Sequence, residues 1–369
     1  MCGWKDSRPG DKVAKHASIR YNYPVNRERR LFMTDNRKIK VILDVDTGSD
    51  DAIAIAAAVL RKELDVIGIC SVGGNVEVKN TTDNTLRVLD CCRRGDVPVY
   101  RGAALPLAST LEPWSLQSRE LPRTEGRKDQ ETAVHTDHLP LPPTELREQR
   151  DSAVVWLINT LLDSEDGEIT LVPVGPITNI ALAMRSDERI IPKIKEIVMM
   201  GGSHDTYAPT QASEFNVWCD PEALEIVLQS GVKVTMVSLD ATSHACLNAR
   251  QAEKLRSIGT PPADLTADLI EHRLKASAAE GDEDGTGVGA ALHDVLAVCS
   301  VIHPDVLETE EVSCHVDLGH GYAYGETVIN RNYRFEEMPK NCLYARRADT
   351  QKFFKWLYGV LEDSKDRFK

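Results

Sequence analysis

The sequence lacks the features that mark membrane proteins and disulfide-rich secreted proteins. Its 369 residues contain no run of about 18 or more apolar residues, so the sequence predicts no membrane-spanning helix. Its nine cysteines form no C-x-x-C pair and follow no spacing typical of small secreted scaffolds. We therefore expect free thiols and a reducing, cytoplasmic location.

Basic side chains are also fewer than acidic ones. The chain has 44 Lys and Arg against 57 Asp and Glu, a net charge of −13 at pH 7, which opposes non-specific binding to nucleic-acid phosphates. A neutral or cationic small molecule fits better as a ligand. Residues 1–38 depart from this trend with ten basic and four acidic side chains, net +6. Because they lack the apolar run of a secretory signal, we expect residues 1–37 to be a flexible basic extension and residues 38–369 to be the single folded domain.

The pattern of apolar residues predicts an α/β fold. Short β-rich runs alternate with helical patterns from Lys38 onward, as expected for a mostly parallel, Rossmann-like central sheet with helices on both faces. The predicted strands cover 40–46, 64–72, 97–100, 168–174, 196–201 and 232–240. The predicted helices cover 50–62, 82–92, 153–163, 177–184, 221–231 and 293–304. Residues 101–150 read as a long loop, and 311–346 as short antiparallel strands before a C-terminal helix.

Four aspartates lie where the first predicted strand ends and a helix begins: Asp44, Asp46, Asp50 and Asp51, in DVDTGSDD. In open α/β sheets, ligands bind outside the carboxyl ends of the strands. Alternation along the strand directs Asp44 and Asp46 to the same side. Two unit charges about 4 Å apart repel by roughly 4 kcal/mol at an effective dielectric near 20, so a convergent cluster should take up protons or hold a cation. Ligands that are all oxygen favour Ca²⁺ or Mg²⁺.

Other interpretations of this cluster remain open at this point. Asp50 and Asp51 could be helix caps while Asp44 and Asp46 are solvated. An EF-hand fits poorly, because Gly48 comes one place early and Ile55 stands where the bidentate Glu belongs. A dehalogenase-type phosphatase would use Asp44 as its nucleophile, because D-x-D-x-T after an apolar strand also occurs there. The helix that starts at once, and the absence of a convincing downstream Lys and acidic pair, disfavour it.

Five further motifs follow in order along the chain: VGGN (72–75), LVPVGPITNIALAM (171–184), MMGG (199–202), EFNVWCDPEA (214–223) and LHDVLAV (292–298). Together with DVDTGSDDAIAI they resemble the inosine-uridine type nucleoside hydrolases over about residues 39–345. The resemblance implies that residues 38–369 are a catalytic domain. It also implies Ca²⁺-dependent hydrolysis of the N-glycosidic bond of a ribonucleoside to free base and ribose, and a homo-oligomer, dimeric or tetrameric.

The resemblance also implies roles for individual residues. The Ca²⁺ ligands would be Asp46, Asp51, Asp294 and the backbone carbonyl of Val174. Asp46 would also take a proton from the metal-bound water that attacks the anomeric carbon. The ribose hydroxyls would be bound by Asp50, Asn75, Glu214 and Asn216, with Asp44 supporting the metal loop. His293 would act as general acid toward the leaving base, the alternative being a capping or packing role.

Two segments depart from the family pattern. The stretch DTYAPTQASEFN (205–216) lacks the Asn that contacts the ribose 5′-hydroxyl, and HTDHLPLPP (135–143) replaces the H-G-x-x-G-L loop that folds over the base. We expect His135 and His138, spaced i, i+3, to belong to a solvated loop and not to a metal site. A non-catalytic nucleoside or ribose binder on the same scaffold is the main alternative function. The complete set of water-activating residues favours the hydrolase.

Overall fold

A nine-stranded sheet forms the centre of the computed structural model, which describes residues 38–108, 134–206, 212–279, 289–330 and 338–369. The predicted extension, residues 1–37, lies outside the described residues. The strand order is β10-β9-β11-β6-β5-β4-β1-β2-β3. The strands are β1 (Ile39–Val45), β2 (Leu64–Ser71), β3 (Val99–Arg101), β4 (Ile169–Pro173), β5 (Ile194–Met200), β6 (Val234–Val237), β9 (Leu307–Val316), β10 (Thr327–Asn330) and β11 (Cys342–Ala348).

Neighbouring strands run parallel from β3 across to β11, and only β9 and β10 are antiparallel to their neighbours within the described part. A separate pair, β7 (Cys246–Leu247) and β8 (Ala290–Ala291), is antiparallel. The predicted α/β class with a mostly parallel sheet is therefore confirmed.

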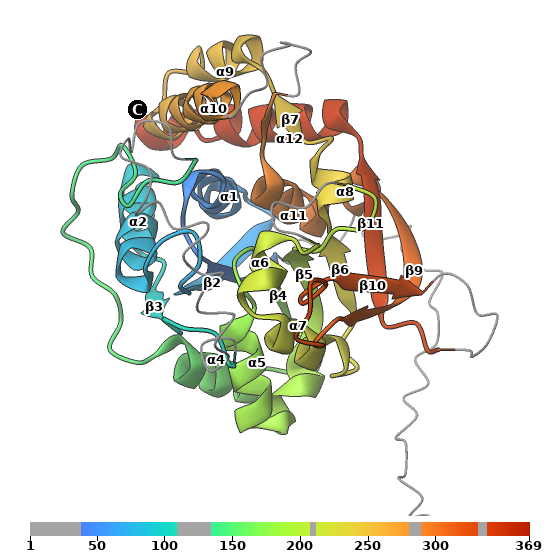
Figure 1. Cartoon of the computed structure of the whole chain (residues 1–369). Coiled ribbons are helices and arrows are strands. Elements are labelled where there is room, and N and C mark those ends of the chain that lie inside the picture. The colour runs from blue at the N-terminus through green and yellow to red at the C-terminus, as the bar shows by residue number, and fades with distance from the viewer. Residues whose placement is uncertain (1–37, 109–133, 207–211, 280–288, 331–337) are drawn as a thin grey trace, which may run out of the picture. The chain divides into compact units, whose positions relative to one another are not determined.

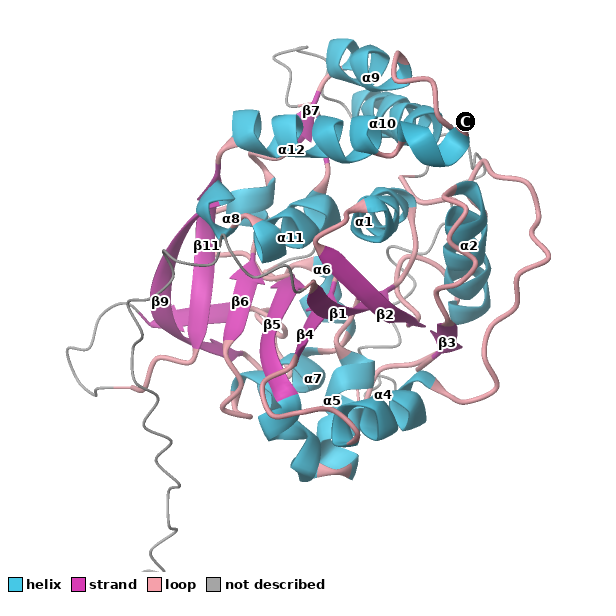
Figure 2. Ribbon diagram, turned by 180° about the vertical axis from the view of Figure 1, so that it is seen from behind, coloured by secondary structure: helices cyan, strands magenta, loops and turns pink. Residues whose placement is uncertain are grey.

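Helices cover both faces of this sheet (Figures 1 and 2). One face carries α1 (Ser49–Leu60), α2 (Val78–Cys91), α8 (Leu239–Thr242) and α11 (His293–Ile302), with α9 (Ala249–Arg256), α10 (Pro261–Ala279) and α12 (Thr350–Asp363) beyond them. The other face carries α4 (Ala153–Leu162), α5 (Thr178–Ser186) and α7 (Pro221–Leu228), and the short α6 (Phe215–Cys219) precedes α7. Each layer buries its own apolar core, with Ile53, Leu296 and Phe353 in the first and Leu157, Ile180 and Leu224 in the second.

Helix α1 is buried on every side. All of its twelve residues are buried, and it packs against α2, α10, α11 and α12. Its sequence, SDDAIAIAAAVL, is apolar all round after the first turn, which is the pattern of a helix enclosed by other elements. The acidic first turn is therefore held rigidly beside the end of β1, and this arrangement places the candidate site.

Three features of the fold differ from the prediction. The strand predicted at 232–240 ends at Val237, because residues from Leu239 turn into α8. The segment predicted as short antiparallel strands includes β11, which is antiparallel to β9 but pairs in parallel with β6. The sequence did not predict α9 or α10, because α10 is buried on several faces and shows no single apolar stripe.

Other expectations agree with the structure where it describes the chain. Residues 102–108 and 134–150 contain neither helix nor strand, as the predicted long loop requires. In the described part of the chain, no helix is long and apolar enough to cross a membrane. Every described cysteine is a free thiol.

Candidate active site

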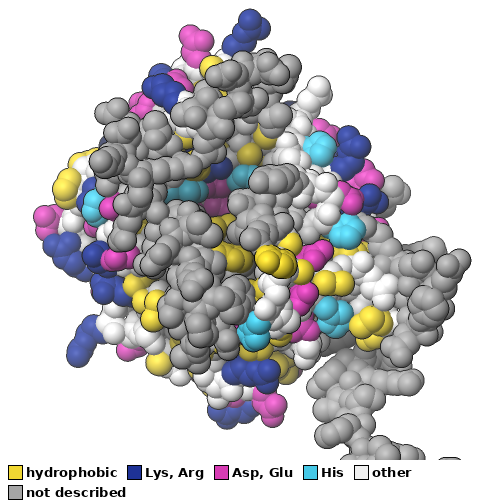
Figure 3. All heavy atoms as spheres, in the orientation of Figure 1, with side chains coloured by type: hydrophobic (Ala, Val, Ile, Leu, Met, Phe, Trp, Pro, Cys, Tyr) yellow, Lys and Arg dark blue, Asp and Glu magenta, His cyan; other side chains and the backbone are white. Residues whose placement is uncertain are grey.

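Five buried aspartates gather where β1 ends and where α1 and α11 begin. Asp44, Asp46, Asp50, Asp51 and Asp294 are each at most 4% exposed. One carboxylate oxygen from each of Asp50, Asp51 and Asp294 lies within 4.8 Å of the others. Helices α1 and α11 pack together, so two stretches far apart in the sequence meet here. Figure 3 shows acidic, basic and histidine side chains together in a hollow on this side of the molecule.

Asp46 and Asp51 are fixed by the backbone around them. Asp51 Oδ1 accepts a hydrogen bond from the Asp46 backbone N at 3.2 Å, and its Oδ2 accepts from the Gly48 backbone N at 3.0 Å and Asn75 Nδ2 at 3.1 Å. Asp46 Oδ2 accepts from the Asn75 backbone N at 2.7 Å. Asp46 Oδ1 is buried and has no hydrogen-bond partner among the described residues. An unpaired buried carboxylate oxygen is costly unless a cation or proton satisfies it.

The raised pKa values of three of these carboxyl groups also indicate that the site favours a positive charge. Burial, reinforced by the neighbouring Asp50, raises the pKa of Asp51 to about 6. Burial also raises the pKa of Asp46 well above its ordinary value, with Asp51 adding to the effect. The pKa of Asp294 is raised in the same way, by burial and by its carboxylate neighbours. Carboxyl groups in this state either bind protons or bind a cation.

Asp50 differs from the other aspartates because it has a cationic partner. Arg273 Nη1, from α10, donates to Asp50 Oδ1 at 2.9 Å and to Ser49 Oγ at 2.8 Å. Burial alone would raise the pKa of Asp50, but Arg273, with His135 and His293, brings it below its ordinary value. Asp50 is therefore ionised without help from a metal.

Asp44 is held inside the protein. Its side chain is 1% exposed, and its Oδ1 accepts a hydrogen bond from Asn179 Nδ2 at 2.8 Å. Asn179 also donates to the Ser71 carbonyl at 3.1 Å and accepts from the Ala103 backbone N at 2.8 Å. Burial raises the pKa of Asp44 to about 7. Through Asn179, Asp44 is therefore tied to the end of β2 and to the segment after β3.

A second group of predicted residues lies near the end of β4. Asn216 Nδ2 donates to the Val174 carbonyl at 2.8 Å, so this oxygen keeps one further lone pair. Glu214 caps α6: its carboxylate accepts hydrogen bonds from the backbone N of Gly202, Asn216 and Val217. Burial raises the pKa of Glu214 to about 7, although these three donors oppose the shift.

His293 begins α11 next to Asp294. Its Nδ1 lies 2.7 Å from the Thr242 Oγ1 atom of α8. Burial lowers the pKa of His293 to about 4, with Arg273 adding to the shift and Asp50 opposing it. The imidazole is therefore neutral near pH 7, and a role as general acid would require a proton from elsewhere.

The prediction that His135 is a solvated loop residue is wrong. Its Nδ1 accepts a hydrogen bond from the Ser49 backbone N at 3.2 Å, at the start of α1, and the side chain is half-buried. Burial lowers the pKa of His135 to about 4, which Asp50 opposes. His138, by contrast, is exposed and lies 3.3 Å from Asp83, as expected of a surface residue.

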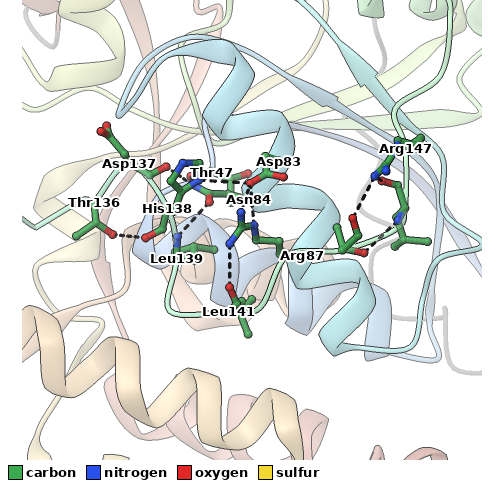
Figure 4. A network of polar contacts seen from close by, with 12 residues as sticks. Thr47, Asp83, Asn84, Arg87, Thr136, Asp137, His138, Leu139, Leu141 and Arg147 are labelled. Carbon is green, nitrogen blue, oxygen red and sulfur yellow. Dashed lines mark hydrogen bonds and ion pairs between the residues drawn. The ribbon is translucent and has the colours of Figure 1, made fainter.

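The loop that carries His135 is fastened to α2 (Figure 4). Asn84 Nδ2 donates to the carbonyls of Thr47 at 3.0 Å and Asp137 at 3.3 Å, and its Oδ1 accepts from the Leu139 backbone N at 3.1 Å. Arg87 donates to the Leu141 carbonyl at 2.9 Å. The side chain of Asn84 therefore joins the turn after β1 to the loop around His135.

Sequence reasoning missed Arg273 and misjudged His135. His135 stands where the family's H-G-x-x-G-L loop would begin, and that position was its only signal in the sequence. Arg273 lies in a helix that the sequence did not predict, 223 residues from Asp50. Its surroundings, LIEHRLKA (269–276), hold two other charged side chains and a histidine, so no local pattern singled it out.

Comparison with known proteins places the chain in a family. The family model of the inosine-uridine preferring nucleoside hydrolases matches residues 41–355. The pyrimidine-specific ribonucleoside hydrolase RihB of Escherichia coli (strain SE11) is 34% identical over 328 residues, which cover 88% of this chain and 96% of RihB.

Solved structures agree with this assignment. A purine-preferring ribonucleoside hydrolase from Gardnerella vaginalis has a TM-score of 0.74 at 27% identity, covering 88% of this chain and 99% of that one. An inosine-guanosine nucleoside hydrolase has a TM-score of 0.72 at 26% identity, covering 89% and 99%. This chain therefore belongs to the inosine-uridine preferring nucleoside hydrolase family and is an N-glycosyl hydrolase of ribonucleosides.

Proposed function

We propose that this hydrolase works with Ca²⁺, held by carboxylate oxygens of Asp46, Asp51 and Asp294 and by the carbonyl oxygen of Val174. The observation that carries the proposal is the buried Asp46 Oδ1, which has no partner among the described residues. The raised pKa values of the three carboxyl groups add to it, because each group favours a nearby positive charge. A set of oxygen ligands suits Ca²⁺.

Asp50 is the member of the cluster that we leave out of the ligand set. Its carboxylate lies close to those of Asp51 and Asp294, but Arg273 already neutralises it. The Val174 carbonyl can take part, because Asn216 occupies only one of its lone pairs.

Asp46 is the proposed general base. When bound, the ion would supply Lewis-acid chemistry that lowers the pKa of a water molecule. Asp46 Oδ2 is fixed by the Asn75 backbone N, and the lone pairs of the unpartnered Oδ1 would serve both the ion and the proton of the attacking water. Burial raises the pKa of Asp46 in the metal-free protein, and the bound cation would keep this carboxylate ionised, as a general base must be. As the oxygen of the water attacks the anomeric carbon, the N-glycosidic bond breaks. The electron pair of that bond leaves with the nucleobase.

The remaining residues would bind the sugar and the base. Asp50, Asn75, Glu214 and Asn216 offer the acceptors and donors that ribose hydroxyls require. Positive charge develops on the ribose as the bond breaks, and ionised carboxylates beside it stabilise that charge. His293 would donate a hydrogen bond to the leaving base from Nε2, the tautomer that results when Thr242 donates its hydroxyl to Nδ1.

The decisive experiment is a panel assay with calcium-loaded protein and inosine, uridine, cytidine and adenosine, following free base by chromatography. The 34% identity to a pyrimidine-specific hydrolase makes uridine and cytidine the first candidates. Asp46→Asn should lower kcat by about 10²- to 10⁴-fold while circular dichroism shows an intact fold. The matched control is Asp366→Asn, whose carboxylate is 88% exposed and pairs with Lys369.

Binding without turnover would contradict this proposal. If the protein binds ribose and Ca²⁺ yet releases no base from any of the four nucleosides, the non-catalytic binder is the better account. Full activity of the Asp46→Asn variant would remove Asp46 from the role of base. The homo-oligomeric state and the cytoplasmic location stay predictions of the sequence.

A further inference from the structure

Arg273 of α10 forms the most deeply buried ion pair of the described part of the chain. The side chains of Arg273 and Asp50 are 9% and 5% exposed, and no other ion pair among the described residues has both side chains below 10%. Taking two charges out of water is expensive, and apolar residues of similar volume often stabilise a fold equally well. A buried pair of this kind therefore needs an explanation besides stability.

Packing between α1 and α10 does not supply that explanation. The two helices share one apolar cluster, which includes Ile53 and Ile55 of α1 and Leu269 and Ile270 of α10. Asp50 also lies in the first turn of α1, where the helix N-terminus already favours a carboxylate. Arg273 contacts Asp50 outside this apolar cluster, beside the acidic site.

Arg273 contacts the start of α1 through a single nitrogen, Nη1. Arg273 Nη1 bonds Asp50 Oδ1 at 2.9 Å and Ser49 Oγ at 2.8 Å, so the guanidinium is held in two directions. An oxygen of Asp50 also lies within 4.8 Å of oxygens of Asp51 and Asp294, close enough for Asp50 to turn toward the same cation.

We propose that Arg273 is a positioning residue that holds Asp50 out of the ligand set of the cation and keeps it available for the ribose hydroxyls. The inference rests on the proposed function, which assigns Asp50 to the sugar. A charge-assisted hydrogen bond anchors Oδ1, and rotation of the carboxylate toward the cation would break it. Without Arg273, the cation gains a fourth carboxylate and the substrate loses a binding partner.

Two variants separate the charge of Arg273 from its geometry. Arg273→Met removes both the charge and the donors, whereas Arg273→Lys keeps the charge and a donor. Isothermal titration of chelator-stripped protein with CaCl₂ gives the calcium affinity, and steady-state assays give kcat and KM for the nucleoside that the wild type cleaves best. Arg273→Met should bind calcium about 10-fold more tightly and raise KM by about 10- to 100-fold, with Arg273→Lys between it and the wild type.

Two controls test the pathway through Asp50. Lys275→Met removes an exposed cation two residues away on α10 and should change neither quantity. In an Asp50→Asn background, Arg273→Met should leave the calcium affinity unchanged, because no carboxylate remains that can turn toward the ion. Calcium binding that tightens equally in this background would show a simple charge effect and would overturn the proposal.

Other results would also overturn it. An unchanged KM in Arg273→Met removes the positioning role. Weaker calcium binding together with a lower melting temperature shows that Arg273 serves the packing of α10. Should the wild type cleave no nucleoside, the proposed function fails, while the calcium titrations still decide whether Arg273 restrains Asp50: tightening that depends on Asp50 supports the restraint, and no tightening contradicts it.

Discussion

At the scale of single residues, the candidate site requires a residue without a side chain at position 74. Gly74 lies against the Asp46 carboxylate, and a Cβ added at this position would stand 2.1 Å from Asp46 Oδ2. The next residue, Asn75, donates its backbone N to that same oxygen. Only glycine lets the chain pass so close and still hold Asp46 by its backbone.

Gly74→Ala should therefore displace the Asp46 carboxylate and lower kcat/KM by about 100-fold or more. We expect overpacking to cost about 1–3 kcal/mol of unfolding free energy, which leaves the protein folded. Gly359→Ala is the matched control, because a Cβ in this part of α12 meets nothing within 4 Å. It should keep full activity and stabilise the protein by about 0.5–1 kcal/mol in urea unfolding. Wild-type kinetics of Gly74→Ala would show that the Asp46 position tolerates movement.

At the scale of elements, α2 acts as an anchor for a loop that has no regular structure. Asn84 contributes both of its polar atoms, to Thr47 and Asp137 on one side and to Leu139 on the other (Figure 4). These contacts hold His135 against the start of α1, where it meets the Ser49 backbone N. An irregular loop is thereby given a fixed position beside the acidic cluster.

Asn84→Ala should release this loop. The substitution leaves buried backbone groups without partners, so we expect a loss of about 2–3 kcal/mol in urea unfolding, with a rise in KM as His135 loses its place. Thr144→Ala removes a half-buried hydroxyl that donates to Asp90 of the same helix at 2.8 Å and accepts from the Leu146 backbone N at 3.1 Å, and it should cost about 1 kcal/mol or less. Equal effects of the two changes would mean that the loop is not fastened through Asn84.

At the scale of the whole molecule, the acidic cluster links folding to pH and to calcium. Without a cation, the folded state binds protons at Asp51 more tightly than the unfolded chain does, since burial raises the pKa of Asp51 from 3.8 to about 6. Burial also raises the pKa values of Asp46 and Asp294. Stabilisation from these protons is complete below the unfolded pKa and is lost as the pH rises through the folded values.

Calcium should therefore stabilise the protein more at high pH. Protons compete with the cation for the same oxygens, and a ligand that binds only the folded state raises its melting temperature by mass action. We expect the rise in melting temperature on adding CaCl₂ to chelator-treated protein to be larger near pH 8 than near pH 5.5, as measured by scanning calorimetry. The variant Asp294→Asn should lose most of that rise. An increment that is the same at both pH values would argue against a cation at this cluster.

Local patterns of residues were sufficient to predict the fold class and the position of the acidic cluster. Alternation of β-rich and helical runs determined the α/β class, and the DVDTGSDD segment located the acidic cluster, because a strand end and a helix start are set by neighbouring residues. Local patterns failed where burial overrides them. Residues after Val237 look like a continuing strand but form α8, and α10 has no apolar stripe because it is enclosed on several sides.

By itself, then, the sequence determined the sheet, the acidic turn at its edge and the family resemblance, since each of these depends on residues close together in the chain. Only the tertiary structure decided which distant side chains complete the site. Arg273 reaches Asp50 across 223 residues, and His135 reaches Ser49 across 86. Such contacts arise from the way helices and loops pack on the finished sheet, and no periodicity or motif in the chain encodes them.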